Sequence, residues 1–343
     1  MYNYDEKQQK NAFANEIVLD QKHGYITRKK LAKKAISSET NWLNFAMIFF
    51  FVGSLLTSLM MNFLSMFLSV QNYQVLFLSE YYYAWTGIAS FMSLALPFFI
   101  YIKAKGEKIS DLLCFEKTKS YGALFVLAGL GCCYFINIPV NILTELFYQM
   151  GYQVTSQSID VPYTISGIII LYFSVAIVPA LVEEFVLRGI FLKKLQRFGN
   201  AFAIIISSLI FSLLHMDLMV IIVTFVAGLV MGFIYVKTKN LWYSVIIHFL
   251  NNFFSVTMTI VYSYYGDSDF GLFIQLILFY TPIVLGLIAF IILIMKKQIN
   301  LPKNNAYGFI GAGTKFSAAI LNPCTIVLVL TCLTIAIMSV AAI

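Results

Sequence analysis

Long apolar segments are the feature that most limits what this chain can fold into. Hydrophobic residues make up 60% of the sequence. They gather in segments of about 20 residues or more, the length that a helix needs to cross about 30 Å of hydrocarbon. Nine spans are predicted, at approximately 42–69, 83–102, 121–147, 163–187, 200–216, 218–236, 241–263, 271–295 and 318–341. The sequence therefore predicts an all-α protein, a polytopic membrane helical bundle.

Composition argues against two other classes of protein. Charged residues are 11% of the chain, against roughly a quarter in a soluble domain. A disordered chain would be poor in apolar residues and rich in charge. The net charge of +7 would suggest nucleic acid as a partner of a soluble protein. Here the basic residues lie in short segments between the apolar ones, so no nucleic-acid partner is expected.

The cysteines and the N-terminus give negative results. The five cysteines contain no CxxC pair and lie mostly in apolar spans, so they are interpreted as small buried side chains; they are Cys114, Cys132, Cys133, Cys324 and Cys332. The first 40 residues are polar and basic. Since no apolar segment with a cleavage site follows the start, a signal peptide is not expected.

The positions of Lys and Arg predict the orientation in the membrane. Basic residues lie before the first span and after the second, fourth, sixth and eighth spans, whereas the other loops contain none. Basic loops remain on the cytoplasmic side. We therefore expect a multi-pass protein of the cell membrane with a cytoplasmic N-terminus and an external C-terminus. The basic tail is expected to face anionic lipid.

The chain is expected to have four parts. About eight transmembrane helices would form the bundle, and the last span would be an extra C-terminal helix after a linker at 298–317. The stretch 104–120 is predicted to be a short interfacial helix. The predicted parts are a basic cytoplasmic tail (1–40), N-terminal transmembrane helices (41–160), a core that holds the intramembrane polar residues (161–270) and C-terminal transmembrane helices (271–343).

The fifth and sixth predicted spans leave an alternative open. They are short, and only Met216 and Asp217 join them. They are either two crossing helices or a shallow hairpin that does not cross. Both ends stay on the same side in either case, so the distribution of charge does not decide between them.

Ionisable residues inside the spans require an explanation, because each costs about 2.5 to 3.5 kcal/mol on insertion scales. Glu183, Glu184 and Arg188 end the fourth span, and His215 and His248 lie in later spans. Glu184 and Arg188 are four residues apart and can pair on one helix face. Glu183 lies about 100° around the helix and is left out of that pair.

Two further pairs share a helix face. Phe211 and His215 are four residues apart, and so are His248 and Asn252. Together with Glu183, these side chains could activate a water molecule and stabilise an oxyanion. Simpler interpretations exist for each: an ion-paired helix end, histidines that bond between helices, and an asparagine that packs helices. These simpler interpretations do not predict that all of these residues occur together in this order along the chain.

The three motifs resemble those of the CPBP family of intramembrane proteases, the CAAX-protease and bacteriocin-processing (Abi-type) proteins. The family pattern is EExxxR, FxxxH and HxxxN on successive core helices. It matches Glu183, Glu184 and Arg188, then Phe211 and His215, then His248 and Asn252. The resemblance covers about residues 160–270. It does not extend to the first 120 residues or to the last span.

The resemblance implies a role for each residue. Glu183 would be the general base for the attacking water, and His215 would help to orient or deprotonate that water. His248 and Asn252 would stabilise the tetrahedral oxyanion. Glu184 and Arg188 would brace the site as an ion pair, with Phe211 as structural support.

A metal ion is an open alternative for this family, because Glu and His side chains are zinc ligands. If zinc is bound, Glu183, His215 and His248 would hold it. The sequence has no HExxH motif, so it is not a protease of the type that uses that motif. No cofactor is otherwise expected.

The leading hypothesis is a membrane-embedded endopeptidase whose substrate is a peptide or a membrane-associated protein. Relatives imply roles in peptide maturation, bacteriocin self-immunity or envelope regulation. The alternative is a non-proteolytic scaffold of the same fold that holds a partner membrane protein. A transporter, with Glu183 and the histidines as a proton relay, is less favoured, because no internal repeat is evident.

The catalytic hypothesis sets one geometric condition. His215 lies 18 residues after Arg197, so a straight crossing helix would carry it toward the far side of the membrane. To join Glu183, the fifth span must begin as an interfacial segment or form a shallow hairpin with the sixth. A separation of more than about 10 Å between His215 and Glu183 would contradict catalysis.

Overall fold

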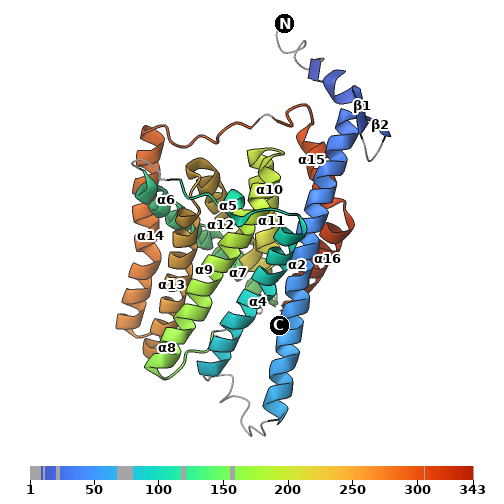
Figure 1. Cartoon of the computed structure of the whole chain (residues 1–343). Coiled ribbons are helices and arrows are strands. Elements are labelled where there is room, and N and C mark those ends of the chain that lie inside the picture. Colours follow the sequence, from blue (N-terminus) through green and yellow to red (C-terminus); the bar gives the residue numbers. More distant parts are fainter. Residues whose placement is uncertain are drawn as a thin grey trace.

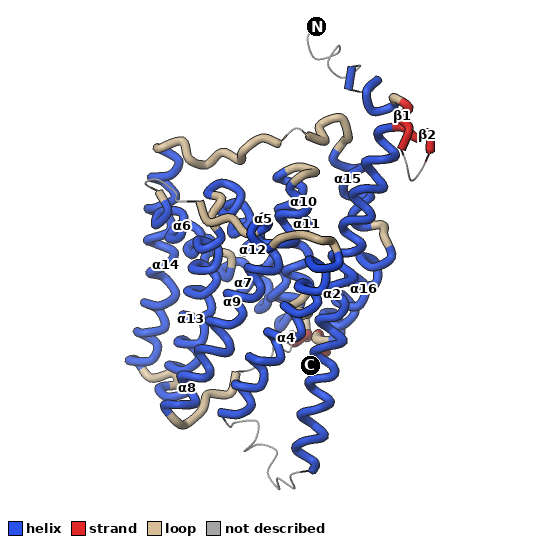
Figure 2. The backbone as a smooth tube through the Cα atoms, in the orientation of Figure 1, coloured by secondary structure: helices blue, strands red, loops and turns tan. Residues whose placement is uncertain are grey.

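The computed structural model describes residues 9–10, 12–20, 24–67, 80–116, 121–154, 159–304 and 306–342. Parts of the predicted basic tail, including His23, and residues 117–120 of the predicted interfacial helix lie outside these ranges. Figure 1 shows a bundle of long, roughly aligned helices, and Figure 2 shows how little of it is strand.

Helices account for most of the described chain. Seven of them are long and apolar enough to cross a membrane, or eight if one bent pair counts as a span. The prediction of a polytopic helical membrane bundle is confirmed. The long elements are α2 (Arg28–Phe67), α4 (Glu80–Ala104), α6 (Gly122–Phe135) with α7 (Asn137–Gln149), α8 (Ile165–Tyr172) through α10 (Lys193–Gln196), α12 (Leu218–Thr238), α13 (Leu241–Tyr265) and α14 (Asp269–Met295).

Two of the nine predicted segments are not straight spans. Helix α11 (Asn200–Leu213) has 14 residues, so it is about 21 Å long, shorter than the hydrocarbon layer. The last segment is a pair of helices, α15 (Ala312–Ile320) and α16 (Pro323–Met338), bent by 76° at their junction. The helix breaks there because Asn322 caps α16: its side-chain oxygen accepts from the Thr325 N–H at 3.0 Å.

Helices α11 and α12 form an antiparallel hairpin. Glycines on α12 allow the close approach: a Cβ at Gly228 would lie 2.9 Å from Ser208 Cβ, and one at Gly232 would lie 3.2 Å from Ile204 Cγ2. The GxxxG spacing is typical of close helix contacts in membranes. Asp217 starts α12 by accepting from the Met219 and Val220 N–H groups at 2.9 and 3.0 Å. The start of α11 and the end of α12 therefore lie at the same end of the bundle.

That end also collects the basic loops. Arg197 pairs with Glu39 at 2.6 Å, and Lys239 pairs with Glu116 at 3.3 Å. Lys194 bonds to Glu107 and Lys237 bonds to Asn300. Lys315 donates to the Phe198 carbonyl at 2.7 Å. Loops far apart in sequence thus meet at one end, as the alternation of charge requires.

The segment between α4 and α6 differs from its prediction. Of its described residues, which end at 116, only α5 (Ile109–Leu112) is helical. The chain then runs extended beside the turn between α12 and α13. Leu241 N–H donates to the Cys114 carbonyl at 2.9 Å, and Glu116 N–H donates to the Lys239 carbonyl at 3.0 Å. These bonds satisfy the backbone without a longer helix.

The N- and C-terminal elements are joined to the bundle by polar contacts. Helix α2 begins at Arg28, well before the predicted start at residue 42. Buried amides tie it to the bent pair: Asn44 donates to the Thr325 hydroxyl at 2.5 Å, and Asn322 donates to the Thr40 hydroxyl at 3.0 Å. Two short antiparallel pairs complete the fold, β1 (Ile17–Asp20) with β2 (Gly24–Thr27) and β3 (Tyr152–Val154) with β4 (Val340–Ala342).

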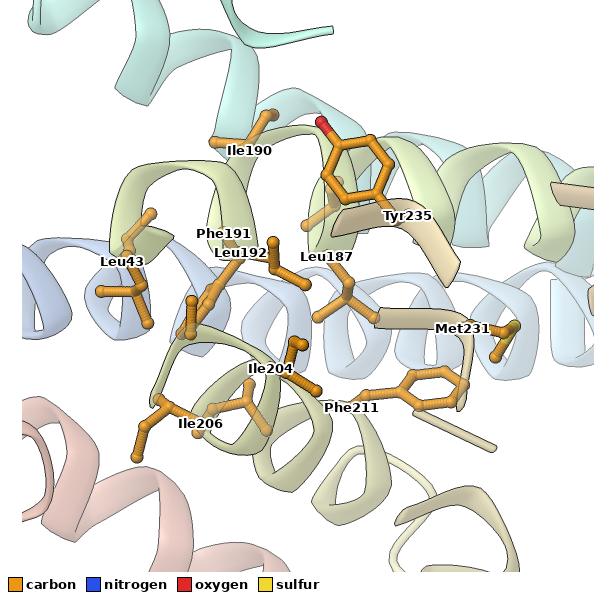
Figure 3. Close-up of a cluster of buried hydrophobic side chains, with 14 of the residues drawn as sticks. Leu43, Leu187, Ile190, Phe191, Leu192, Ile204, Ile206, Phe211, Met231 and Tyr235 are labelled. Atoms are coloured by element: carbon orange, nitrogen blue, oxygen red, sulfur yellow. The ribbon is translucent and has the colours of Figure 1, made fainter. Parts of the chain in front are cut away.

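Apolar side chains from several helices fill the centre of the bundle. Figure 3 shows side chains of α2, of the segment after α9, of α11 and of α12 gathered in one cluster. The labelled residues are Leu43, Leu187, Ile190, Phe191, Leu192, Ile204, Ile206, Phe211, Met231 and Tyr235. This cluster fixes the hairpin against the helix that carries the two glutamates. All five cysteines are unpaired.

Candidate active site

The two glutamates lie on α9 (Val178–Glu184), in the middle of a continuous helical segment from Ile165 to Gln196. The segment is longer than the predicted span 163–187. Two π-helical stretches flank α9: η1 (Phe173–Ile177) and η2 (Phe185–Leu192). Such π-helical turns are rare in proteins, and those that do occur are often found at functional sites. Glu183 is therefore well inside a long helix and not at its end.

Glu184 contacts both Arg188 and His248. Arg188 Nη1 donates to Glu184 Oε1 at 2.7 Å, and both side chains are buried. The predicted pairing between positions four apart is confirmed. The same oxygen, Oε1, lies 3.0 Å from Nδ1 of His248, on α13. The carboxylate thus holds the arginine and also orients the imidazole, a second contact that spacing along one helix could not reveal.

Glu183 faces the other nitrogen of the same imidazole. Its Oε2 lies 3.9 Å from Nε2 of His248. This distance is too long for a hydrogen bond. The Glu183 side chain is 24% exposed, whereas the Glu184 side chain is 0% exposed. One carboxylate is therefore fixed and buried, and its neighbour is accessible and has no hydrogen bond among the described residues.

Phe211 links the arginine to both histidines. Its ring lies 4.7 Å from Arg188 Cζ and makes edge contacts with His215 and His248, at centroid distances of 5.3 and 5.8 Å. Phe211 is buried, and His215, at the tip of the α11–α12 hairpin, is exposed. Because α11 is short and begins at the basic end, its tip brings His215 beside the ring that His248 also contacts.

Asn252 has a partner that the motifs do not indicate. Its side-chain amide donates to the Val175 carbonyl, in η1, at 3.1 Å. Pro179 follows Val175 by four residues and has no N–H to donate to that carbonyl in an α-helical ladder. In η1 the Val178 N–H bonds instead to the Phe173 carbonyl, the π-helical pattern. Pro179 is the sequence signal that could have predicted this break.

Most of the site residues predicted from the sequence contact one another, but Asn252 does not contact the glutamates or histidines through a hydrogen bond among the described residues. His248 contacts both glutamates, and Phe211 contacts Arg188, His215 and His248. Asn252, one helical turn beyond His248 on α13, is oriented by η1, and no hydrogen bond joins it to the glutamates or histidines among the described residues.

The proposed zinc ligands do not form a metal site in this arrangement. Within the described ranges, no three His, Cys, Asp or Glu side chains converge in a way that could hold a metal ion. His215, the third proposed ligand, meets the site through the ring of Phe211. The residues as arranged therefore do not fit a bound zinc ion.

One known protein family matches the segment that holds these residues. The family described as Type II CAAX prenyl endopeptidase Rce1-like matches residues 165–254, which hold all three motifs. This segment of the chain is therefore similar to the Rce1-like CAAX prenyl endopeptidase family. The resemblance seen in the sequence is confirmed, and the CAAX-type core extends from the first turn of α8 to the middle of α13.

Two curated relatives are similar to parts of this chain. The Membrane-embedded CAAX protease MroQ of Staphylococcus aureus (strain USA300) is 34% identical over 148 residues, which are 41% of this chain and 60% of MroQ. The Putative membrane peptidase YdiL of Bacillus subtilis (strain 168) is 34% identical over 84 residues, 24% of this chain and 34% of YdiL. The chain thus spans less than two thirds of either relative. No solved structure gave a significant match.

Proposed function

We propose that this protein is an intramembrane endopeptidase that cleaves a peptide or a membrane-associated protein, with Glu183 as the general base for the attacking water. One observation carries the proposal. The accessible carboxylate of Glu183 stands 3.9 Å from His248, and the other nitrogen of that imidazole is held by a buried, arginine-paired carboxylate. This pairing of a free base with an oriented imidazole is suited to hydrolysis.

His248 would take part in the reaction through its two ring nitrogens. Nδ1 lies 3.0 Å from Glu184 Oε1, and this contact orients the ring. Nε2 faces Glu183 and has no hydrogen bond among the described residues, so it is placed to interact with the oxyanion that forms when water attacks the peptide carbonyl. Glu184 acts on the reaction by orienting this imidazole.

The remaining residues complete the proposed reaction. Glu183 takes the proton of the attacking water and can return it to the leaving amine. Asn252 uses one amide proton on the Val175 carbonyl and has a second for the oxyanion. His215 orients the water from the hairpin tip, and Phe211 packs against both histidines. In this proposal residues 161–270 are the catalytic core of the chain.

The names of the relatives support a proteolytic role, since one is called a membrane-embedded CAAX protease and the other a putative membrane peptidase. We propose peptide maturation, bacteriocin self-immunity or envelope regulation as the biological setting. The basic end of the bundle would face the cytoplasm, with the N-terminus inside and the C-terminus outside.

Mass spectrometry of enriched protein termini tests the proposal. Cells that carry the natural protein would be compared with cells that carry Glu183→Ala at equal abundance. Peptide ends found only with the natural protein would establish proteolysis and identify substrates. Identical sets of ends, with any phenotype preserved in the variant, would instead support the scaffold, in which the same fold holds a partner membrane protein.

Removal of metal ions is expected to leave hydrolysis intact, because Glu183, His215 and His248 do not converge as a ligand set. The purified protein would be dialysed against 1,10-phenanthroline and then assayed on a substrate identified from the enriched termini. A known zinc protease treated in parallel is the positive control. Loss of activity that returns only with added zinc would contradict a glutamate mechanism.

Replacing Pro179 with alanine is expected to lower kcat by up to about 100-fold, the cost of a small misplacement at a reacting centre. Alanine introduces a backbone N–H that can bond to the Val175 carbonyl. This N–H then competes with the Asn252 amide for the same acceptor. KM should change little, and folded yield should not fall, because alanine suits a helix better than proline.

The matched control for this substitution is Pro282→Ala, since Pro282 also lies inside a membrane-spanning helix, α14. This variant should keep both kcat and KM. An unchanged kcat in Pro179→Ala would show that η1 does not position Asn252 for the reaction.

A further inference from the structure

A groove of about 540 Å³ runs between α2 and α4, outside the site described above. Its walls are formed by residues from Trp42 to Leu56 on α2 and from Met92 to Ala104 on α4, and they are almost entirely apolar. The two helices approach closely beside the groove, where a Cβ at Gly53 would lie 2.7 Å from Ser93 Cβ. The Tyr101 hydroxyl, on α4, also donates to Glu39, on α2, near the other end of the groove.

The length of the groove matches one lipid chain. From Trp42 to Leu56 and from Met92 to Lys105, the walls extend for about 20 Å at 1.5 Å per residue. One leaflet supplies about half of the 30 Å hydrocarbon layer, and the interface adds a few ångströms. An acyl chain from one leaflet could therefore lie along the groove with its headgroup at the Lys105 end.

Among the described residues that line the groove, one is charged: Lys105, which lies at that end. Lys105 Nζ lies 5.2 Å from the ring centroid of Trp42 and 5.9 Å from that of Tyr101. Amphipathic aromatic rings favour the membrane–water interface. Lys105 makes no ion pair with a carboxylate among the described residues. The nearby acids are occupied, since Glu39 binds Arg197 and Tyr101, and Glu107 binds Lys194.

We propose that this groove binds an anionic phospholipid of the surrounding membrane, with one acyl chain between α2 and α4 and the phosphate at Lys105. The apolar walls accept any acyl chain, so selectivity comes from the unpaired ammonium. A zwitterionic lipid brings its own positive group close to Lys105, whereas an anionic headgroup does not. A basic residue near a membrane surface attracts anionic lipid by about 1 kcal/mol, which corresponds to a preference of about fivefold.

Fluorescence quenching of Trp42 tests the proposal, because Trp42 borders the groove. The full chain with Trp85→Phe and Trp242→Phe keeps Trp42 as its only tryptophan. It would be reconstituted in vesicles of unlabelled phosphatidylcholine that contain a minor amount of brominated phosphatidylglycerol or brominated phosphatidylcholine. We expect phosphatidylglycerol to quench Trp42 at about one fifth of the concentration that phosphatidylcholine requires.

Two lysine variants distinguish a specific site from a diffuse basic surface. Lys105→Gln should abolish the preference for phosphatidylglycerol. Lys103→Gln removes the same charge two residues away on α4, from a residue that is exposed and does not line the groove, and it should retain the preference. Lys105→Arg should also retain it, which separates loss of charge from misfolding.

Three results would overturn the proposal. Equal quenching by the two lipids in the parent protein would show that the groove does not select anionic lipid. Equal losses in Lys103→Gln and Lys105→Gln would assign the preference to the surface charge as a whole. A preference that survives in Lys105→Gln would exclude Lys105 as the headgroup contact.

Discussion

Replacing Glu183 with glutamine is expected to reduce the rate of peptide-bond hydrolysis by a factor of about 10² to 10⁴, the usual contribution of a general base. Glutamine keeps the size of the side chain but cannot accept the proton of the attacking water. The fold should be unaffected, because Glu183 is partly exposed and no hydrogen bond joins it to another described side chain. The rate would be measured in proteoliposomes on a substrate identified from the enriched termini.

The matched control is Glu145→Gln, on α7. Glu145 is also a glutamate within a membrane-spanning helix, but it bonds to Gln149 and not to the site. The Glu145→Gln variant should hydrolyse the substrate at the rate of the natural protein. Full activity of Glu183→Gln at equal folded yield would exclude Glu183 as the general base.

Replacing Glu184 with glutamine is expected to cost about 3 to 5 kcal/mol of unfolding free energy, because it leaves Arg188 charged and unpaired in the interior. The loss should be larger than a surface pair would give, since both side chains are almost fully buried. Glu184 Oε2 has no hydrogen-bond partner among the described residues, so Oε1 alone carries both contacts. Denaturant titration in mixed micelles would measure the change.

A control and a double variant separate stability from positioning. Glu116→Gln breaks the pair with Lys239, in which both side chains are 62% exposed, and it should cost at most about 1 kcal/mol. Glu184→Gln combined with Arg188→Met removes both charges and should recover much of the stability. It should not recover hydrolysis, because His248 still lacks its carboxylate. A double variant with full activity would exclude a positioning role for Glu184.

Local spacing predicted those contacts that form within one helix. The four-residue spacing of Glu184 and Arg188 predicted their ion pair, and that of Phe211 and His215 predicted their shared face. Hydropathy predicted the class of fold, and the positions of Lys and Arg predicted that the basic loops meet at one end. These features follow from periodicity and from the thickness of the membrane.

Contacts between helices could not be predicted in the same way. His248 bonds to Glu184, which is 64 residues earlier in the sequence, and Asn252 bonds to Val175, which is 77 residues earlier. The depth of the α11–α12 hairpin depends on the approach of Gly228 to Ser208. The bend before α16 depends on buried amides that bond to α2. Each depends on how two elements pack, which hydropathy does not record.

The sequence by itself determined a helical membrane protein with charged residues that a lipid environment disfavours, together with three motifs in family order. Only the tertiary structure decided that one imidazole lies between the two carboxylates, with the inner one fixed by Arg188 and the outer one accessible. The physical reason is that the contacting residues lie on different helices, far apart in the sequence. Hydrophobic periodicity specifies which face of each helix avoids lipid, whereas the meeting of polar faces from different helices is fixed by side-chain packing between them.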